Sequence, residues 1–201
     1  MRKICLFIWC VLPIAWACYY YGPGQEHLKR DNAAELMQQA RVEEKNGNWD
    51  KARQLYDDAV KMLPEENSDH EKVTLRLAKL RTFLNSSEAV KATEEAEALM
   101  LDVETGKLKV SSKYKNDIRA SLAHAEYYTA WHMRLEGSPR VKWMKELETA
   151  RQNFRVLAEQ QGDKSLKTNL EAAILLARMD LNKLKTIPIP DKDSGKGSSG
   201  C

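Results

Sequence analysis

The amino-acid sequence predicts an all-α fold for the central part of the chain, residues 31–184. Three observations support this prediction. This stretch contains only four Gly and two Pro, and each of them lies where the apolar pattern breaks. Between the breaks, apolar residues recur at steps of three and four, which is the spacing of one helix face. Only residues 107–110 have the alternation of a strand, and they are too few to build a sheet.

The breaks divide the central part into seven predicted helices joined by short linkers, so that successive helices are antiparallel neighbours. These helices are 33–45, 49–62, 69–84, 86–101, 112–135, 139–161 and 164–183. Asn32 and Glu35 have the spacing of a capping box at the start of the first helix, and Gly47 follows its end. Asn85 is the expected cap of the fourth helix, and Pro139 suits the first position of the sixth.

The first helical pair, residues 33–66, combines small and aromatic residues at a characteristic spacing. The residues of this pattern are Leu36, Ala40, Gly47, Trp49, Ala52, Tyr56, Ala59 and Pro64. Small side chains at Ala40 and Ala52 let two helix axes approach, while Trp49 and Tyr56 fill the space beside them. The pattern resembles the tetratricopeptide repeat (TPR), a helix–turn–helix unit of about 34 residues. Glu43 departs from it, because the family usually has an aromatic residue there.

The resemblance weakens along the chain. Its small–aromatic–small spacing recurs as Ala89, Thr93 and Ala96, and as Ala150, Phe154 and Leu157. The last predicted helix has one apolar stripe and looks like the capping helix that closes such an array. The resemblance therefore implies a right-handed superhelix of about three helical hairpins plus a C-terminal capping helix over residues 31–184.

The chain begins with a segment of different composition, residues 1–24. Residues 4–21 are eighteen residues without a charge, and Arg2 and Lys3 precede them. As a helix they rise about 27 Å, close to the roughly 30 Å hydrocarbon thickness of a bilayer. We expect a signal anchor in the bacterial inner membrane, with the repeat domain outside the cytoplasm because basic residues stay inside. Two alternatives are a cleaved signal peptide and a lipoprotein with lipidated Cys18.

Composition excludes some functional classes and describes the C-terminus. The 32 Lys and Arg residues nearly balance the 29 Asp and Glu residues, so that no basic excess favours nucleic-acid binding. The four Cys lie near the two ends of the chain and form no CxxC motif. Residues 185–201 are rich in Pro, Gly, Ser and charge, which predicts a flexible tail.

The sequence contains no motif of a common enzyme class. It lacks HExxH, GxSxG, a P-loop and GxGxxG, so we expect no catalytic site, cofactor or small-molecule substrate. One alternative remains open, because His132 and Glu136 have the i, i+4 spacing of helical metal ligands and His124 lies on the same helix face. This alternative is a metal-binding protein or an enzyme that uses these three residues.

Taken together, these features predict a membrane-anchored, non-enzymatic scaffold that binds a protein or peptide partner. The layout resembles bacterial membrane-anchored TPR proteins of unassigned function. In the family, the first helices of successive pairs line a concave binding surface. The candidate partner-groove residues are Met37, Arg41, Glu44, Tyr127, Tyr128 and Trp131. The alternative function is a secreted or lipidated soluble subunit of an envelope complex.

Overall fold

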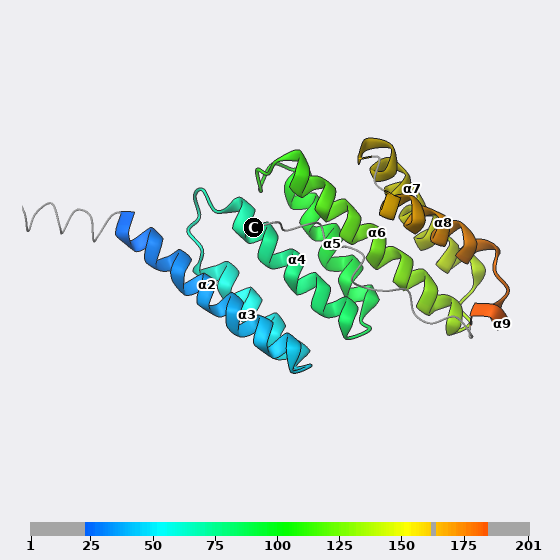
Figure 1. Cartoon of the computed structure of the whole chain (residues 1–201), viewed down its shortest axis with the longest axis horizontal. Coiled ribbons are helices and arrows are strands. Elements are labelled where there is room, and N and C mark those ends of the chain that lie inside the picture. The colour runs from blue at the N-terminus through cyan, green and yellow to red at the C-terminus, as the bar shows by residue number, and fades with distance from the viewer. Residues whose placement is uncertain (1–22, 162–163, 185–201) are drawn as a thin grey trace, which may run out of the picture. The chain divides into compact units, whose positions relative to one another are not determined.

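The computed structural model describes residues 23–161 and 164–184 (Figure 1). These residues form helices and connecting turns without a strand, which confirms the all-α prediction. The helices are α2 (Pro23–Lys45), α3 (Trp49–Met62), α4 (Asp69–Asn85), α5 (Ala89–Glu104), α6 (Ser112–Leu135), α7 (Arg140–Gln161), α8 (Lys164–Arg178) and α9 (Leu181–Leu184). The predicted anchor 4–21, Cys18 and the predicted tail 185–201 lie outside the described residues.

Two helix starts differ from the prediction. Helix α2 begins at Pro23 rather than at residue 33, so Asn32 lies inside the helix and is no cap. Pro is favoured in the first turn of a helix, and the polar residues that follow it carry no apolar stripe that would reveal them as helical. Helix α5 begins at Ala89 rather than at residue 86, and Asn85 is instead the last residue of α4.

The end of the helical region also differs in detail. The single predicted helix 164–183 is interrupted at Met179 and Asp180, and separates into α8 and the short α9. Residues 107–110 form part of the connection between α5 and α6 rather than a strand. Within the described residues, no helix combines the length and the apolar character needed to cross a membrane.

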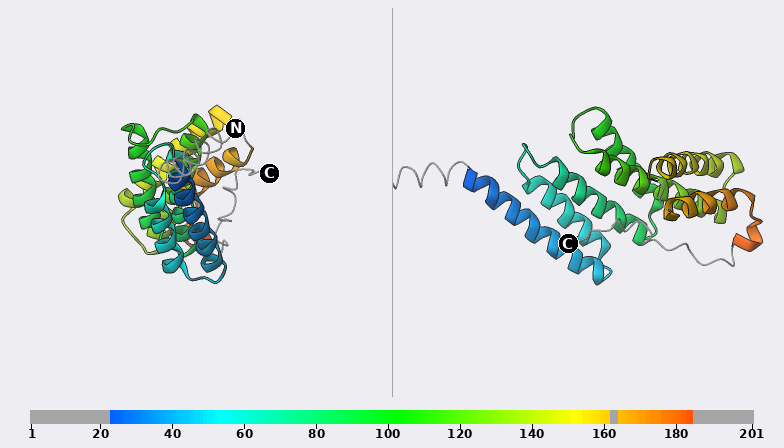
Figure 2. Two further views of the ribbon diagram at one scale, coloured as in Figure 1. Left: turned by 90° about the vertical axis from the view of Figure 1, so that its left-hand side faces the viewer. Right: turned by 45° about the horizontal axis from the view of Figure 1, so that its top comes forward.

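The described residues form two compact units, which divide between Leu75 and Arg76. In the first unit, α2 and α3 are a hairpin and lie side by side in Figures 1 and 2. Ala40, Ala52 and Ala59 have no exposed surface at this contact, and Tyr56 is equally buried. Hydrogen bonds from the Arg30 guanidinium to Glu71 and to the carbonyl of Asn67 connect α2 to the segment that starts α4. The hairpin is therefore held mainly by close packing of small side chains.

In the second unit, successive helices α5, α6, α7 and α8 each pack against the next (Figure 1). The shared core is rich in Ala and aromatic side chains, among them Trp131, Trp143 and Phe154. Arg134 of α6 donates hydrogen bonds to the carbonyls of Leu176 and Met179 near the end of α8. Its guanidinium also lies 4.8 Å from the ring centroid of Trp143, a cation–π arrangement. Arg134 thus joins α6, α7 and the α8–α9 turn.

Candidate functional site

Three turns, between α2 and α3, α4 and α5, and α6 and α7, have the same geometry. Their central residues Gly47, Ser87 and Gly137 have φ angles of 76°, 63° and 75°. In each turn the N–H of this residue donates to the carbonyl three residues earlier, and the next N–H donates to the carbonyl five residues earlier. This is the Schellman pattern, which satisfies the last carbonyls of a helix. The three hairpins therefore share one structural unit. The turns are unevenly spaced along the sequence, so a search for a fixed repeat length does not find this unit.

The buried packing positions follow from these turns. Seven residues before the turn residue, the three hairpins have Ala40, Leu80 and Ala130 in that order. Five residues after it, the first two hairpins have Ala52 and Ala92. All five have at most 1% of their surface exposed. The turns therefore align Tyr56 with Ala96 and Ala59 with Leu99, not with Thr93 and Ala96 as the sequence spacing suggests. That difference of three residues equals the error in the predicted start of α5.

The remaining packing residues of the first hairpin take different environments. Leu36 and Trp49 are half-buried, Pro64 is buried, and Gly47 is exposed in the turn. Glu43, which departs from the TPR pattern, accepts hydrogen bonds from Lys51 Nζ at 2.5 Å and from Asn48 Nδ2 at 2.7 Å. These hydrogen bonds, first that from Lys51, lower the pKa of the Glu43 carboxyl. A charged contact thus connects the end of α2 to the start of α3 where the family has a ring.

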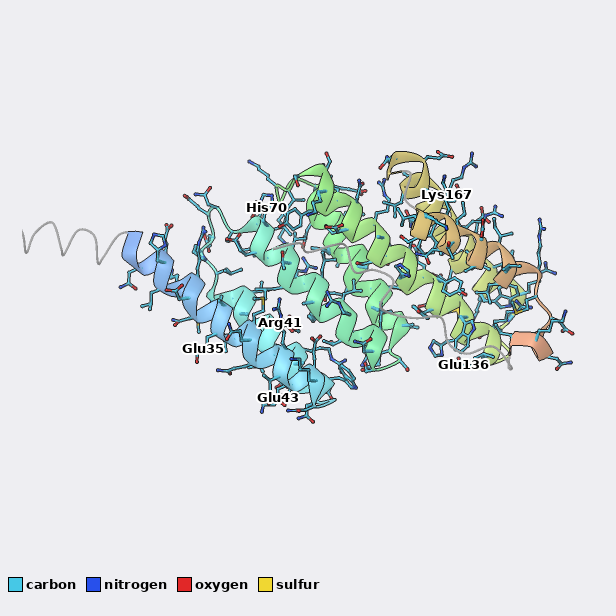
Figure 3. All side chains as sticks on the ribbon, viewed as in Figure 1. Glu35, Arg41, Glu43, His70, Glu136 and Lys167 are labelled. Atoms are coloured by element: carbon cyan, nitrogen blue, oxygen red, sulfur yellow. The ribbon has the colours of Figure 1, made fainter. Side chains whose placement is uncertain are left out.

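The first part of the predicted partner groove lies on α2. Arg41 is exposed, whereas Met37 and Glu44 are half-buried. The Arg41 Nη2 atom lies 3.9 Å from the Met37 sulfur, so these two side chains share one face of the helix. Arg41 is labelled in Figure 3. The face offers a cation, a polarizable thioether and a carboxylate in one row, which is suited to a polypeptide with mixed polar and apolar side chains.

The second part of the predicted groove lies inside the core of the other unit. Tyr127, Tyr128 and Trp131 of α6 expose only 8%, 3% and 6% of their surface. The two tyrosine rings meet edge to face with centroids 5.6 Å apart, and the Trp131 ring meets that of His132 in the same way at 5.1 Å. In this conformation these rings stabilise α6 in its own core and have little surface for a partner.

The three residues of the metal alternative are not brought together. The His124 ring packs edge to face against Phe154 of α7, with centroids 5.1 Å apart, whereas Glu136 is exposed in the turn after α6. Among the residues that the structure describes, no three His, Cys, Asp or Glu side chains have positions that could hold a metal ion.

Sequence reasoning missed a group of buried polar side chains on α6. Glu126 exposes 2% of its surface, and one of its carboxyl oxygens accepts a hydrogen bond from Asn153 Nδ2 of α7 at 3.0 Å. Burial, with smaller contributions from the carboxylates of Glu146 and Glu97, raises the pKa of Glu126 to about 7 despite this hydrogen bond. One turn away, the hydroxyls of Thr93 and Thr129 lie 3.1 Å apart.

A helical pattern contained the signal for Glu126. It lies three residues after Ala123 and four before Ala130, both fully buried, so it occupies the apolar face of α6. A charged residue type at such a position predicts either a buried partner or a shifted pKa.

A partly buried ion-pair network connects α4 with α5. Arg76 contacts Glu95 at 2.9 Å and Asp102 at 2.5 Å, and Lys79 contacts Glu95 at 3.2 Å. Lys107 completes it, 3.0 Å from Asp102. The four inner side chains of the network are less than a quarter exposed, so they fix the helix pair more effectively than surface pairs do. These charged side chains pair with one another and stabilise the packing of α4 against α5.

Comparison with models of known protein families, with curated proteins and with solved structures gives no significant match.

Proposed function

We propose that this chain is a non-enzymatic, TPR-like scaffold that binds a protein or peptide partner. In this proposal residues 4–21 hold it in the bacterial inner membrane, and the helical hairpins lie outside the cytoplasm. The observation that carries the proposal is the repeated hairpin, with one turn geometry at Gly47, Ser87 and Gly137. The seventh residue before each turn is buried, and so is the fifth residue after the first two turns. Stacked hairpins of this kind present extended surfaces that suit a polypeptide ligand.

The α2 face is the part of the predicted groove that the proposal uses. Arg41 is exposed and lies beside Met37, and Glu44 continues the same face. Arg and Met are both frequent at protein interfaces, Arg for its bidentate hydrogen bonds and Met for its adaptable shape. Membrane anchoring would raise the local concentration of the scaffold around a membrane-bound partner.

Site-specific photocrosslinking in cells tests this surface. A photoreactive residue replaces Arg41 in one full-length variant and Gln39 in the matched control. Both positions are exposed on α2, but two residues apart they point to nearly opposite sides of the helix. The proposal predicts one recurrent crosslinked protein from position 41 and a much weaker product from position 39. Equal crosslinking from both positions, or none from either, would contradict a partner surface on this face.

The mass of the mature N-terminus tests the anchor separately. An intact chain in the membrane fraction supports the signal anchor. A mature chain that starts at a lipid-modified Cys18 identifies a lipoprotein, and a shorter unmodified chain identifies a cleaved signal peptide. Either of these two results would contradict the signal anchor and support the secreted or lipidated alternative. The crosslinking experiment would still test the α2 surface independently.

A further inference from the structure

Helix α8 has an inner face that packs on its own unit and an outer face that is exposed. The inner face lies against α7 and the shared core, where Ala173 and Leu176 are buried (Figure 1). Glu171, Leu175 and Arg178 are all exposed and form the outer face. With 3.6 residues per turn, this second set points nearly opposite to the first.

The outer face has a large apolar side chain at its centre. Leu175 is 58% exposed, and it belongs to a run of six apolar residues, 172–177, that covers more than one full turn of the helix. A helix that is apolar all round is usually covered on all sides. We therefore expect another surface to cover Leu175.

Opposite charges lie on the two sides of Leu175. Glu171 is four residues before it and Arg178 three residues after it, so the two charged residues are about 10 Å apart along the helix axis. This separation of two turns is too large for an ion pair within the helix. Among the residues that the structure describes, no partner forms an ion pair with either side chain. The face therefore has an acidic end, an apolar centre and a basic end, all available for contact.

Such a face is complementary to itself. We propose that the outer face of α8 binds the same face of a second copy of this chain, with the two helices antiparallel. A two-fold axis beside Leu175 brings the two leucines together and places each Glu171 opposite Arg178 of the other copy. A parallel pair would instead place Glu beside Glu and Arg beside Arg. The charges thus select the antiparallel orientation, which the opposed helix dipoles also favour.

The size of the outer face determines how strong this contact is. The 15 residues of α8 make a helix about 22 Å long and about 10 Å wide, so that two copies would bury roughly 450 Å² in total. Stable complexes usually bury about 1,200–2,000 Å². The contact is therefore weak and transient, and it forms at high protein concentration. The proposed membrane anchor would supply such a concentration, but the contact itself does not depend on the anchor.

Photocrosslinking of the purified full-length protein over a series of concentrations tests the contact, in a detergent that disperses the apolar residues 4–21. A photoreactive residue replaces Leu175 in one variant and Val141 in the matched control. Val141 is an apolar residue of α7 in the same unit and is 83% exposed. The proposal predicts a product of twice the chain mass from position 175, with a yield that rises with concentration, and little product from position 141.

Three results of this experiment would overturn the proposal. The first is the absence of a doubled product from position 175 at the highest concentration, and the second is an equal yield from position 141. The third is a product of unchanged mass that is linked to residues 185–201, because it would show that the C-terminal segment of the same chain covers Leu175.

Charge reversal tests the antiparallel arrangement. Glu171→Arg places two arginines at each contact, and Arg178→Glu places two glutamates there. Either variant should reduce the doubled product roughly tenfold, because symmetry changes two contacts at once. The double variant should restore the product. Both positions are exposed, so neither substitution should affect folding.

A mixture of the two single variants gives the sharpest test. One copy then has two arginines on its outer face and the other has two glutamates, so the two variants should crosslink to each other better than either does to itself. Single variants that crosslink like the wild type, or a mixture that does not recover the product, would overturn the proposal. These outcomes are separate from those for the α2 surface, because a partner at Arg41 gives a product with a different protein.

Discussion

The substitution Ser87→Gly should stabilise the protein, because Ser87 occupies a position where the two equivalent turns have Gly. Its φ of 63° lies in the left-handed region, and the side chain is exposed. A residue with a Cβ costs roughly 1–2 kcal/mol in this conformation. Gly removes that cost but loses roughly 0.5–1 kcal/mol through the greater freedom of the unfolded chain. The mid-values of these two ranges give an expected net gain of about 0.8 kcal/mol.

Urea denaturation followed by tryptophan fluorescence measures this gain. With a slope of about 1–3 kcal/mol per molar urea, the midpoint should rise by a few tenths of a molar at unchanged slope. The reverse change at the equivalent turns, Gly47→Ser or Gly137→Ser, should lower the free energy of unfolding by a similar amount. A Cβ at either Gly meets no atom within 4 Å, so this loss is conformational rather than a clash.

The neighbouring substitution Ser86→Gly is the matched control. Ser86 has no positive φ, and its hydroxyl donates to the carbonyl of Phe83 and to Glu88. Gly at this position should therefore reduce stability. The reasoning is refuted if Ser87→Gly fails to stabilise the protein, or if Ser86→Gly stabilises it equally.

Three further predictions concern the interior of the second unit. Ala130→Leu should cost about 1–3 kcal/mol of unfolding free energy in urea denaturation, because Ala130 has no exposed surface; an unchanged midpoint contradicts this close packing. Thr93→Val should cost more than Thr129→Val, because Thr93 also bonds to the carbonyl of Ala89 at 3.2 Å. In a double-mutant cycle the double variant should cost less than the sum, and strict additivity argues against the shared hydrogen bond. Arg134→Met should accelerate amide hydrogen exchange in residues 176–184. Arg134→Lys should restore only part of the protection, because an ammonium group lacks the two-pronged donor geometry of the guanidinium. Equal exchange in the wild type and both variants would contradict the role of Arg134.

Much of the helical order follows from a few punctuating residues. Pro64 and Gly137 stop helices for local reasons, since Pro cannot continue a helix and Gly adopts the left-handed turn. The predicted spans 49–62 and 112–135 are accordingly those of α3 and α6. Local signals of this kind do not depend on the rest of the fold.

The errors arise where one residue type serves two purposes. Asn85 and Ser86 have the composition of a helix cap, but they end α4 and form the turn around Ser87. Glycine is typical of a left-handed turn and serine is not. The sequence spacing therefore aligns the second hairpin with the first three residues out of register. The first residues of α2, from Pro23, have no apolar stripe, so the apolar pattern of the sequence does not predict them as helical.

The candidate site was harder to predict than the fold, because burial depends on which helices pack together. Arg41 of α2 is exposed, whereas the aromatic residues around Trp131 are enclosed by their own unit. The hydrogen bond between Glu126 and Asn153 joins residues 27 positions apart, and no local spacing encodes it. Such long-range polar pairs follow only from the tertiary arrangement.

Hydrogen exchange of the full-length protein with and without the crosslinked partner tests the proposed scaffold most directly. Exchange reports protection along the whole chain and therefore makes no assumption about the binding surface. The account predicts that the partner slows exchange in residues 33–45 of α2, around Met37 and Arg41. Slowing confined to the second unit, or no change in α2, would contradict it.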